Sequence, residues 1–580
     1  MIAHSAKATC VLVLTCLWGL CVGVAHAQPA DWLLTNGKFY TLDSTSAWAR
    51  AAAVKDGKFM FVGAAAKAAR FAGPDTRITD LGGRMVIPGM VDAHTHPGLI
   101  ELEQFDAQID AASADEFFHA LRALATSEDT GDGWLRIWCW PNEAFVDGLS
   151  GPDRAGLDVI FPERPVWISS CAWHSYWLNG AALAALGVSE TTPDPKFPVA
   201  MYARDESGRL TGWVKEGAGW QHQIDVFERN VELHRQSMRS FLDTLSRLGV
   251  TALYDGGNLD YADEVYAFLH SLEQAGQLPL RYEGTYMVSV PEARHRAVAE
   301  MRRYRARYGG ERLRFNTVKL FMDGVHENRS AAMLEPYADT PGYRSDTILT
   351  DSELTDFLLS LHAARLDLHV HVIGDLAVRR VLNAVQAARA ATGPSFYPRV
   401  SMGHLQNIHA DDWRRFGELG VGANFTPWWH GPDPGDTVSE AFEAERLNDM
   451  YRAAALLEHG ANVTFSSDDW NLDVLSPFLG MQVGHTRQYP REWWPRDQDP
   501  QLIRQPASER LPLADLLKGY SLNGAYQLRL EDRMGSISVG KEADLVVLPE
   551  NLFDVDPYRL HAVEPDAVIF AGELIHGTLR

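Results

Sequence analysis

The centre of the 580-residue chain alternates short strand-like runs with amphipathic helical stretches, and the strand-like runs end in polar residues. These runs read PVWISSCAWH, GVTALYDGG, RFNTVKLFMDG, LDLHVHVIGD, RVSMGHLQN and NVTFSSDDWN. Such alternation over several hundred residues predicts a parallel α/β sheet, and a closed (β/α)₈ barrel of the TIM type is the common form at this size. The polar residues then stand at the carboxyl ends of the strands, where such barrels carry their chemistry.

The spacing of these polar strand ends fits a barrel. In the run IPGMVDAHTH, His94 and His96 lie two residues apart and therefore share one face of the first strand. A barrel of about 250 residues has roughly 31 residues per β/α unit, which assigns the later candidates to strands 4, 5, 6 and 8. In that order the candidates are Lys319, His371, His404 and Asp468. The interval from His96 to Lys319 is more than twice what three units need, so we predict a large insertion, at about 100–215, before strand 4.

Both ends of the chain show a different pattern, in which short alternating strands are broken by Asn-Gly and Asp-Gly turns or by single glycines. This is the chemistry of β-hairpins. We predict one small β-sandwich built from both ends, residues 28–88 and 531–580, around a metal-binding barrel at 89–530.

Residues 1–27 predict a secretory signal peptide. His4 and Lys7 precede an apolar run, and Ala25-His26-Ala27 has the small-x-small form of a cleavage site. We therefore expect export, to a periplasm or to the outside of the cell, with cleavage after Ala27. A retained membrane anchor is the alternative, although the apolar run is short for a span of about 20 residues.

The composition excludes some partners. A formal charge of -23, from 76 acidic and 53 basic residues, opposes binding to nucleic acid, and no basic run offsets it. Beyond the signal, no apolar run is long enough to cross a bilayer, so we expect no membrane contact in the mature form. Cys139 and Cys171 are the cysteines left after cleavage, and one disulfide or two free thiols both fit. A homodimer remains open.

Imidazole and carboxylate groups at strand ends around one axis can form a site for Zn²⁺ or a similar divalent ion, with positions left for water. Such an ion lowers the pKa of its water and polarises a carbonyl, while a nearby carboxylate takes the proton. Asp468 is well placed for that base role. Two ions would need a bridging anionic ligand, which Lys319 could supply only after CO₂ converts its amine to a carbamate.

With these residues in this order, the chain resembles the amidohydrolase superfamily, and most closely its YtcJ-like branch, which includes N-substituted formamide deformylases. Seven segments follow in family order over nearly the full length: IPGMVDAHTH, HSYWLNGAAL, TVKLFMDG, HVIGD, GHLQN, FSSDDW and GSISVGKEADLVVL. Each segment alone is weak evidence for the family. Seven segments in the family order are strong evidence for the family and much weaker evidence for a substrate.

The resemblance implies a site for two divalent metal ions, with Zn²⁺ the first candidate. The implied ligands are His94 and His96 for one metal, Lys319 as the carboxylated bridge, His371 and His404 for the second metal, and Asp468 as the base that also contacts metal. His369 shares the face of His371, and we expect it one layer deeper as a hydrogen-bonded barrel histidine. Asp469 should point away from Asp468 as a structural partner.

The substrate is predicted to be a small molecule. The resemblance implies that His174 faces the pocket, and tryptophans cluster in the predicted mouth loops. We therefore predict that the substrate is contacted by His174, Trp177, Trp429 and Trp470. They suggest a bulky or aromatic group on the substrate. For Glu216 and Asp323, which match acidic family positions, we expect structural hydrogen bonds.

The predicted function is metal-dependent hydrolysis of a C–N bond in an amide-like substrate, N-acyl or N-formyl, by activated water and Asp468. Hydrolysis of an ester or lactone is an alternative for the same site. A mononuclear deaminase fits less well, because such sites place a glutamate three residues after the histidine of strand 5, where this chain has Gly374. An exported binding protein that kept the scaffold without the chemistry is the alternative of a different class.

Overall fold

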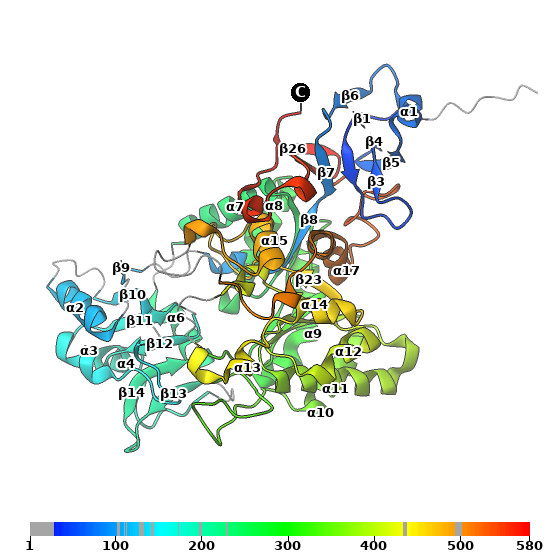
Figure 1. Cartoon of the computed structure of the whole chain (residues 1–580). Helices are drawn as coiled ribbons and strands as arrows, with labels where there is room; N and C mark the ends of the chain where they lie inside the picture. Colours follow the sequence, from blue (N-terminus) through cyan, green and yellow to red (C-terminus); the bar gives the residue numbers. More distant parts are fainter. Residues whose placement is uncertain are drawn as a thin grey trace, which may run out of the picture.

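The computed structural model describes residues 28–579 apart from 101–104, 110, 112, 127–132, 141–143, 172, 196–199, 228–229, 433–437 and 494–501. The predicted signal peptide, residues 1–27, lies outside the described residues. Figure 1 shows three parts: a central barrel, a small β-domain at the upper right and a separate lobe at the lower left.

The barrel has eight parallel strands. They are β8 (Met90–Thr95), β15 (Val250–Asp255), β16 (Arg281–Glu283), β19 (Thr317–Phe321), β20 (Asp367–Val372), β21 (Val400–His404), β22 (Gly422–Phe425) and β23 (Asn462–Phe465). Neighbours pair in parallel from β8 to β16 and from β19 to β23. Just past β23, the backbone N–H of Asp468 donates to the carbonyl of His94 at 2.9 Å and joins the last strand to the first. The predicted (β/α)₈ class is confirmed.

Helices follow the strands and cover the outside of the barrel (Figure 1). They include α7 (Val231–Arg247), α8 (Ala262–Gln274), α9 (Arg294–Tyr308), α10 (Asp351–Ala364), α11 (Asp375–Thr392) and α12 (Ala410–Leu419). In α11, Val378, Leu382 and Val385 are buried at the spacing of one helix face, because that face packs on the strands. A capping box between Thr350 and Glu353 begins α10.

The β-domain is assembled from both ends of the chain, as predicted. Its first sheet has the order β5 (Lys58–Gly63), β4 (Ala51–Lys55), β1 (Trp32–Thr35) and β6 (Arg77–Asp80). Its second has the order β26 (Glu573–Gly577), β25 (Ala567–Phe570), β24 (Leu545–Leu548), β7 (Met85–Pro88), β2 (Lys38–Tyr40) and β3 (Trp48–Ala49). Val546 of β24 pairs with Ile87 of β7, so the C-terminal strands complete a sheet begun by the N-terminal ones. The sandwich adjoins the barrel directly, because β8 starts two residues after β7 ends.

The lobe lies between barrel strands β8 and β15, within the region predicted for the insertion. Its sheet has the order β13 (Met201–Arg204), β14 (Leu210–Lys215), β12 (Ser175–Leu178), β11 (Val166–Ser170), β10 (Leu135–Trp140) and β9 (Ala107–Gln108). The lobe has a hydrophobic core of its own, in which Trp140, Trp177 and Trp213 are fully buried. It lies beside the barrel mouth.

Two further predictions concern the state of the two cysteines and the presence of a membrane-spanning helix. Cys139 and Cys171 form a disulfide that joins β10 to the loop after β11, which settles the alternative left open by the sequence. Within the described ranges, no helix has the length and apolar character needed to cross a membrane.

Candidate metal centre

The predicted ligands lie in, or directly after, five barrel strands. His94 lies in β8 and His96 directly follows that strand, Lys319 lies in β19, and His371 lies in β20. His404 ends β21, and Asp468 follows β23. All six side chains are brought together at one end of the barrel, because parallel strands in register deliver their carboxyl ends to the same edge.

Asp468 is the point on which three imidazoles converge. Its Oδ1 lies 3.4 Å from Nε2 of His94 and 3.3 Å from Nε2 of His96, and its Oδ2 lies 2.9 Å from Nδ1 of His404. Both Asp468 and His404 adopt positive φ, 52° and 73°, so the backbone turns sharply where these side chains enter the site. Burial would raise the pKa of the Asp468 carboxyl, yet the adjacent His404 and His96 rings hold it well below its ordinary value.

Lys319 enters the same cluster from β19. Its Nζ lies 2.8 Å from Nε2 of His94, and the side chain is almost fully buried. Burial lowers the pKa of the Lys319 amine to about 7, against the opposing effect of the carboxylates of Asp468 and Asp255. A large share of this amine is therefore neutral at physiological pH and available as a nucleophile.

His371 and His369 differ in depth, as predicted. The ring of His371 lines the pocket, stacks on Phe321 at 3.9 Å between centroids and lies 4.4 Å from the ring of His404. His369 is buried below, with Nε2 at 2.9 Å from Nδ1 of His94 and Nδ1 at 2.7 Å from Oγ of Ser401. His369 therefore fixes the orientation of His94 and leaves Nε2 of His94 directed into the cluster.

The donor set fits a divalent metal ion. One ligand atom each from His94, His404 and Asp468 lie within 4.8 Å of one another. Among the described residues, no hydrogen-bond partner satisfies the buried Nε2 of His404, whereas buried polar atoms are almost always paired. The site also contains a glycine where a side chain would intrude, since a Cβ on Gly256 would lie 2.6 Å from Nε2 of His94. Imidazole and carboxylate ligands of this kind suit Zn²⁺ and similar ions.

Two acidic residues beside the cluster accept hydrogen bonds from backbone N–H groups. Asp323 accepts N–H bonds from Ala332, Ile373 and Gly374 at 2.9–3.0 Å and so fixes the loop after β20. The Oδ1 of Asp469 accepts from the backbone of Trp470 and Asn471. Both are the structural roles expected from the sequence.

A pocket of about 700 Å³ opens over the cluster. His174, Trp429 and Trp470, three of the residues predicted to contact substrate, line this pocket. Trp138 and Trp173 belong to the same wall: their rings lie 4.0 Å apart, and Trp173 lies 5.0 Å from Trp470. The disulfide half Cys171 also reaches the pocket, so the inserted lobe supplies one wall and the barrel loops supply the rest.

The prediction that Trp177 contacts substrate is wrong. Trp177 is 1% exposed and packs against Phe117 and Phe145 in the core of the lobe. Its neighbour Tyr176 lines the pocket instead, because successive residues of β12 point to opposite faces.

His174 is held by a buried carboxylate. Its Nδ1 lies 2.6 Å from Oε2 of Glu216, which is completely buried, and Oε1 of Glu216 accepts from Asn328 and Ser330 at 3.1 and 2.8 Å. Burial opposes protonation of His174, but Glu216 prevails and raises the pKa of the imidazole. Glu216 thus makes the structural hydrogen bonds predicted for it and also orients a side chain of the pocket.

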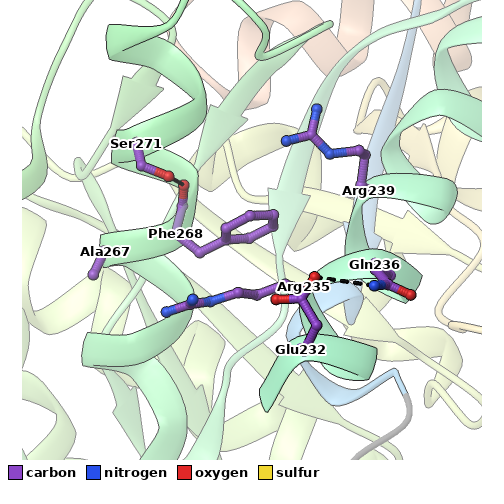
Figure 2. A pocket seen from close by; sticks show the side chains of 7 residues that line it. All are labelled: Glu232, Arg235, Gln236, Arg239, Ala267, Phe268 and Ser271. Carbon is purple, nitrogen blue, oxygen red and sulfur yellow. Dashed lines mark hydrogen bonds between the residues drawn. The ribbon is translucent and has the colours of Figure 1, made fainter. Parts of the chain in front are cut away.

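A second hollow of about 410 Å³ lies on the outer surface between α7 and α8 (Figure 2). Its described lining is Glu232, Arg235, Gln236, Arg239, Ala267, Phe268 and Ser271. Gln236 donates to Glu232, and the guanidinium of Arg235 lies 5.8 Å from the Phe268 ring centroid. These seven residues include neither histidine nor cysteine.

Comparison with known proteins gives a consistent result. A model described as "Amidohydrolase family" matches residues 77–576. YtcJ of Bacillus subtilis (strain 168) is 26% identical over 93% of this chain and 98% of its own length, and the N-substituted formamide deformylase of Arthrobacter pascens is 23% identical over 91% and 95%. A solved structure of an uncharacterised metal-dependent hydrolase from Pyrococcus horikoshii matches with a TM-score of 0.63 and 22% identity, over 94% of this chain and all of that one, and shares the fold.

Proposed function

The chain belongs to the amidohydrolase family and is a metal-dependent hydrolase of that superfamily, and from this premise we propose that it cleaves the C–N bond of an N-acyl or N-formyl amide. The observation that carries the proposal is the convergence of His94, His96 and His404 on the two oxygens of Asp468. The relative from Arthrobacter pascens, named as a deformylase of N-substituted formamides, supports the C–N bond class.

In this proposal the barrel holds two divalent ions. The ligands would be His94 and His96 for one ion, His371 and His404 for the other, and carboxylated Lys319 as the bridge, with Asp468 as the base that also contacts metal. The neutral amine of Lys319 adds to CO₂, forms an N–C bond and releases one proton, which gives the anionic bridge that two cations need. The lowered pKa of Lys319 supports this step, because only the unprotonated amine reacts.

Bound metal would activate water and polarise the substrate carbonyl. The protein supplies the proton transfer: the Asp468 carboxylate, kept ionised by His404 and His96, accepts a proton from the attacking water and returns it to the leaving nitrogen. His369 keeps His94 oriented throughout. His174, fixed by Glu216, contacts the substrate from the lobe, and the tryptophan wall excludes water from the reacting bond.

Two other reactions are conceivable for the same scaffold. Ester or lactone hydrolysis uses the same groups and is separated by comparing matched amide and ester substrates. Deamination by a glutamate after strand 5 meets a steric obstacle, because a Cβ on Gly374 would lie 2.1 Å from the carbonyl oxygen of Ala332. An exported binding protein would keep the pocket but show no turnover with any metal.

We also propose that the chain acts outside the cytoplasm on a small molecule. The Cys139–Cys171 disulfide supports an oxidising compartment, as does the expected signal peptide.

The test is hydrolysis of a panel of N-formyl and N-acyl arylalkyl amines by protein that has been metal-depleted and then restored with Zn²⁺. We expect activity only after restoration. Asp468→Asn should retain bound metal and lose turnover by about 10²–10⁴-fold, because it cannot accept the proton. Asp411→Asn, with its side chain exposed on α12, is the matched control and should stay close to wild type. Undiminished activity of Asp468→Asn would refute the assignment.

A further inference from the structure

The pocket contains a guanidinium that no carboxylate neutralises. Arg504 lines the pocket, its Nε donates to the carbonyl of Gly431 at 2.8 Å, and its Nη1 lies 3.9 Å from Sδ of Met450. Across the described residues no carboxylate forms an ion pair with Arg504, and its Nη2 donates no hydrogen bond. Lys319 is the other lysine or arginine of the described pocket lining, and it belongs to the metal cluster.

A second arginine anchors the main chain that carries Arg504. Arg487 is completely buried and donates to the carbonyl oxygens of Arg504, Gln505 and Tyr451 at 3.0, 3.1 and 3.4 Å. The backbone N–H of Arg504 donates in return to the carbonyl of Arg487 at 3.1 Å. The main chain and Nε of Arg504 are therefore anchored, and the Nη end is the part left to interact with a ligand.

The same barrel loop connects Arg504 to the metal cluster. In the loop after β22, Trp429 stacks on His404 with ring centroids 5.7 Å apart, and two residues later Gly431 accepts the Nε bond of Arg504. The guanidinium also lies over Tyr451, at 5.3 Å from the ring centroid. Arg504 is thus held in a fixed relation to His404, on an aromatic floor.

A partly buried charge without a partner is costly, and a guanidinium matches the planar geometry of a carboxylate through two parallel N–H bonds. The unpaired Nη end of Arg504 is therefore suited to an anion that arrives with the ligand. The wall of Trp138, Trp173 and Trp470 offers a flat apolar surface in the same pocket.

We propose that Arg504 is a specificity residue that binds a carboxylate of the substrate, and that the substrate class is the N-acylated aromatic amino acids. Their aromatic group packs on the tryptophan wall, their carboxylate pairs with Arg504, and their amide lies at the metal cluster. This inference rests on the proposed amide hydrolysis for the identity of the reacting bond, whereas the carboxylate site stands on the geometry of Arg504.

A binding measurement tests the site without turnover. Calorimetric titration of the metal-loaded protein with indole-3-acetate and with indole-3-ethanol compares a carboxylate with an alcohol on the same ring system, and neither probe has a bond to hydrolyse. We expect the carboxylate to bind about ten-fold or more tightly in the wild type, as a charge-assisted pair implies, and to lose that advantage in Arg504→Gln. Arg414→Gln, with its side chain exposed on α12, is the control and should behave as wild type.

A kinetic measurement tests the substrate class. N-formyltryptophan, as either enantiomer, and N-formyltryptamine differ by the carboxylate alone, and Arg504→Gln should lower kcat/KM for the first by about ten-fold or more while leaving the second within about two-fold. Arg504→Lys keeps the positive charge, and the thermal midpoint of each variant reports whether that variant still folds. Together these controls separate a loss of substrate recognition from a loss of folding.

An equal carboxylate preference in wild type and Arg504→Gln would place the anion at the metal and overturn the inference, as would no preference in the wild type. Failure to hydrolyse either formamide would count against the proposed function, and the calorimetric result would still decide the role of Arg504.

Discussion

At the scale of single residues, the site depends on side chains that are each held by one partner behind them. His369 orients His94, and Glu216 orients His174. The Glu216–His174 pair is the easier one to test by mutation. Glu216 is fully buried, and its other carboxylate oxygen accepts hydrogen bonds from Asn328 and Ser330. Its position is thus determined before any substrate binds.

We predict that Glu216→Gln lowers kcat/KM by about ten-fold or more, the usual cost of losing a carboxylate behind a functional histidine. The pH dependence carries a sign: Glu216 raises the pKa of His174, so the variant should lose the His174 proton at a lower pH than wild type does. The pH profile of kcat/KM measures this shift. An unchanged profile would show that the ionisation of His174 does not control the rate.

At the scale of elements, the sequence predicted the strands that carry ligands because the β/α unit repeats. Spacings of about one or two β/α units assigned Lys319, His371, His404 and Asp468 to strands 4, 5, 6 and 8, and the family resemblance selected them as ligands. The inserted lobe has no such repeat, so the face to which each residue of β12 points could not be read from the chain, and Trp177 was assigned to the wrong side. Arg504 lies outside every motif, and only the fold brings it beside the β22 loop.

The two tryptophans should therefore respond differently to truncation. Trp177→Ala removes a fully buried ring from the core of the lobe and should destabilise that lobe by about 3–5 kcal/mol, the range for large core truncations. Trp470→Ala, at the pocket wall, should raise KM and leave the thermal midpoint near that of wild type. Thermal unfolding and steady-state kinetics on both variants check this, and a raised KM without destabilisation in Trp177→Ala would restore it to the pocket.

At the scale of the whole molecule, a buried ion pair joins the barrel to the sandwich. Arg281 of β16 is 2% exposed, and its Nη1 lies 2.7 Å from Oδ2 of Asp544, which immediately precedes β24; it also pairs with Glu542. The C-terminal strands are therefore tied to the barrel as well as to the N-terminal strands. This connection explains how residues from both chain ends form one body with the catalytic domain.

We predict that Arg281→Met costs about 3–5 kcal/mol of stability, because Asp544 is left buried without its partner. The double variant Arg281→Met/Asp544→Leu should recover part of that loss, since the buried Asp544 charge is gone and Glu542 keeps its ion pair with Arg533 at 2.6 Å. Urea unfolding followed by circular dichroism measures both. A double variant as unstable as the single one would mean that the interface packing, rather than the charge, was disrupted.

The two-ion site bridged by Lys319 is decided by the metal content of the purified protein. Elemental analysis should find two ions per chain in wild type and in the surface control Lys58→Ala, and one or none in Lys319→Ala. One ion per chain that is indifferent to Lys319 would contradict the bridge and indicate a mononuclear enzyme. No ion after purification with added metal would contradict the hydrolase mechanism itself.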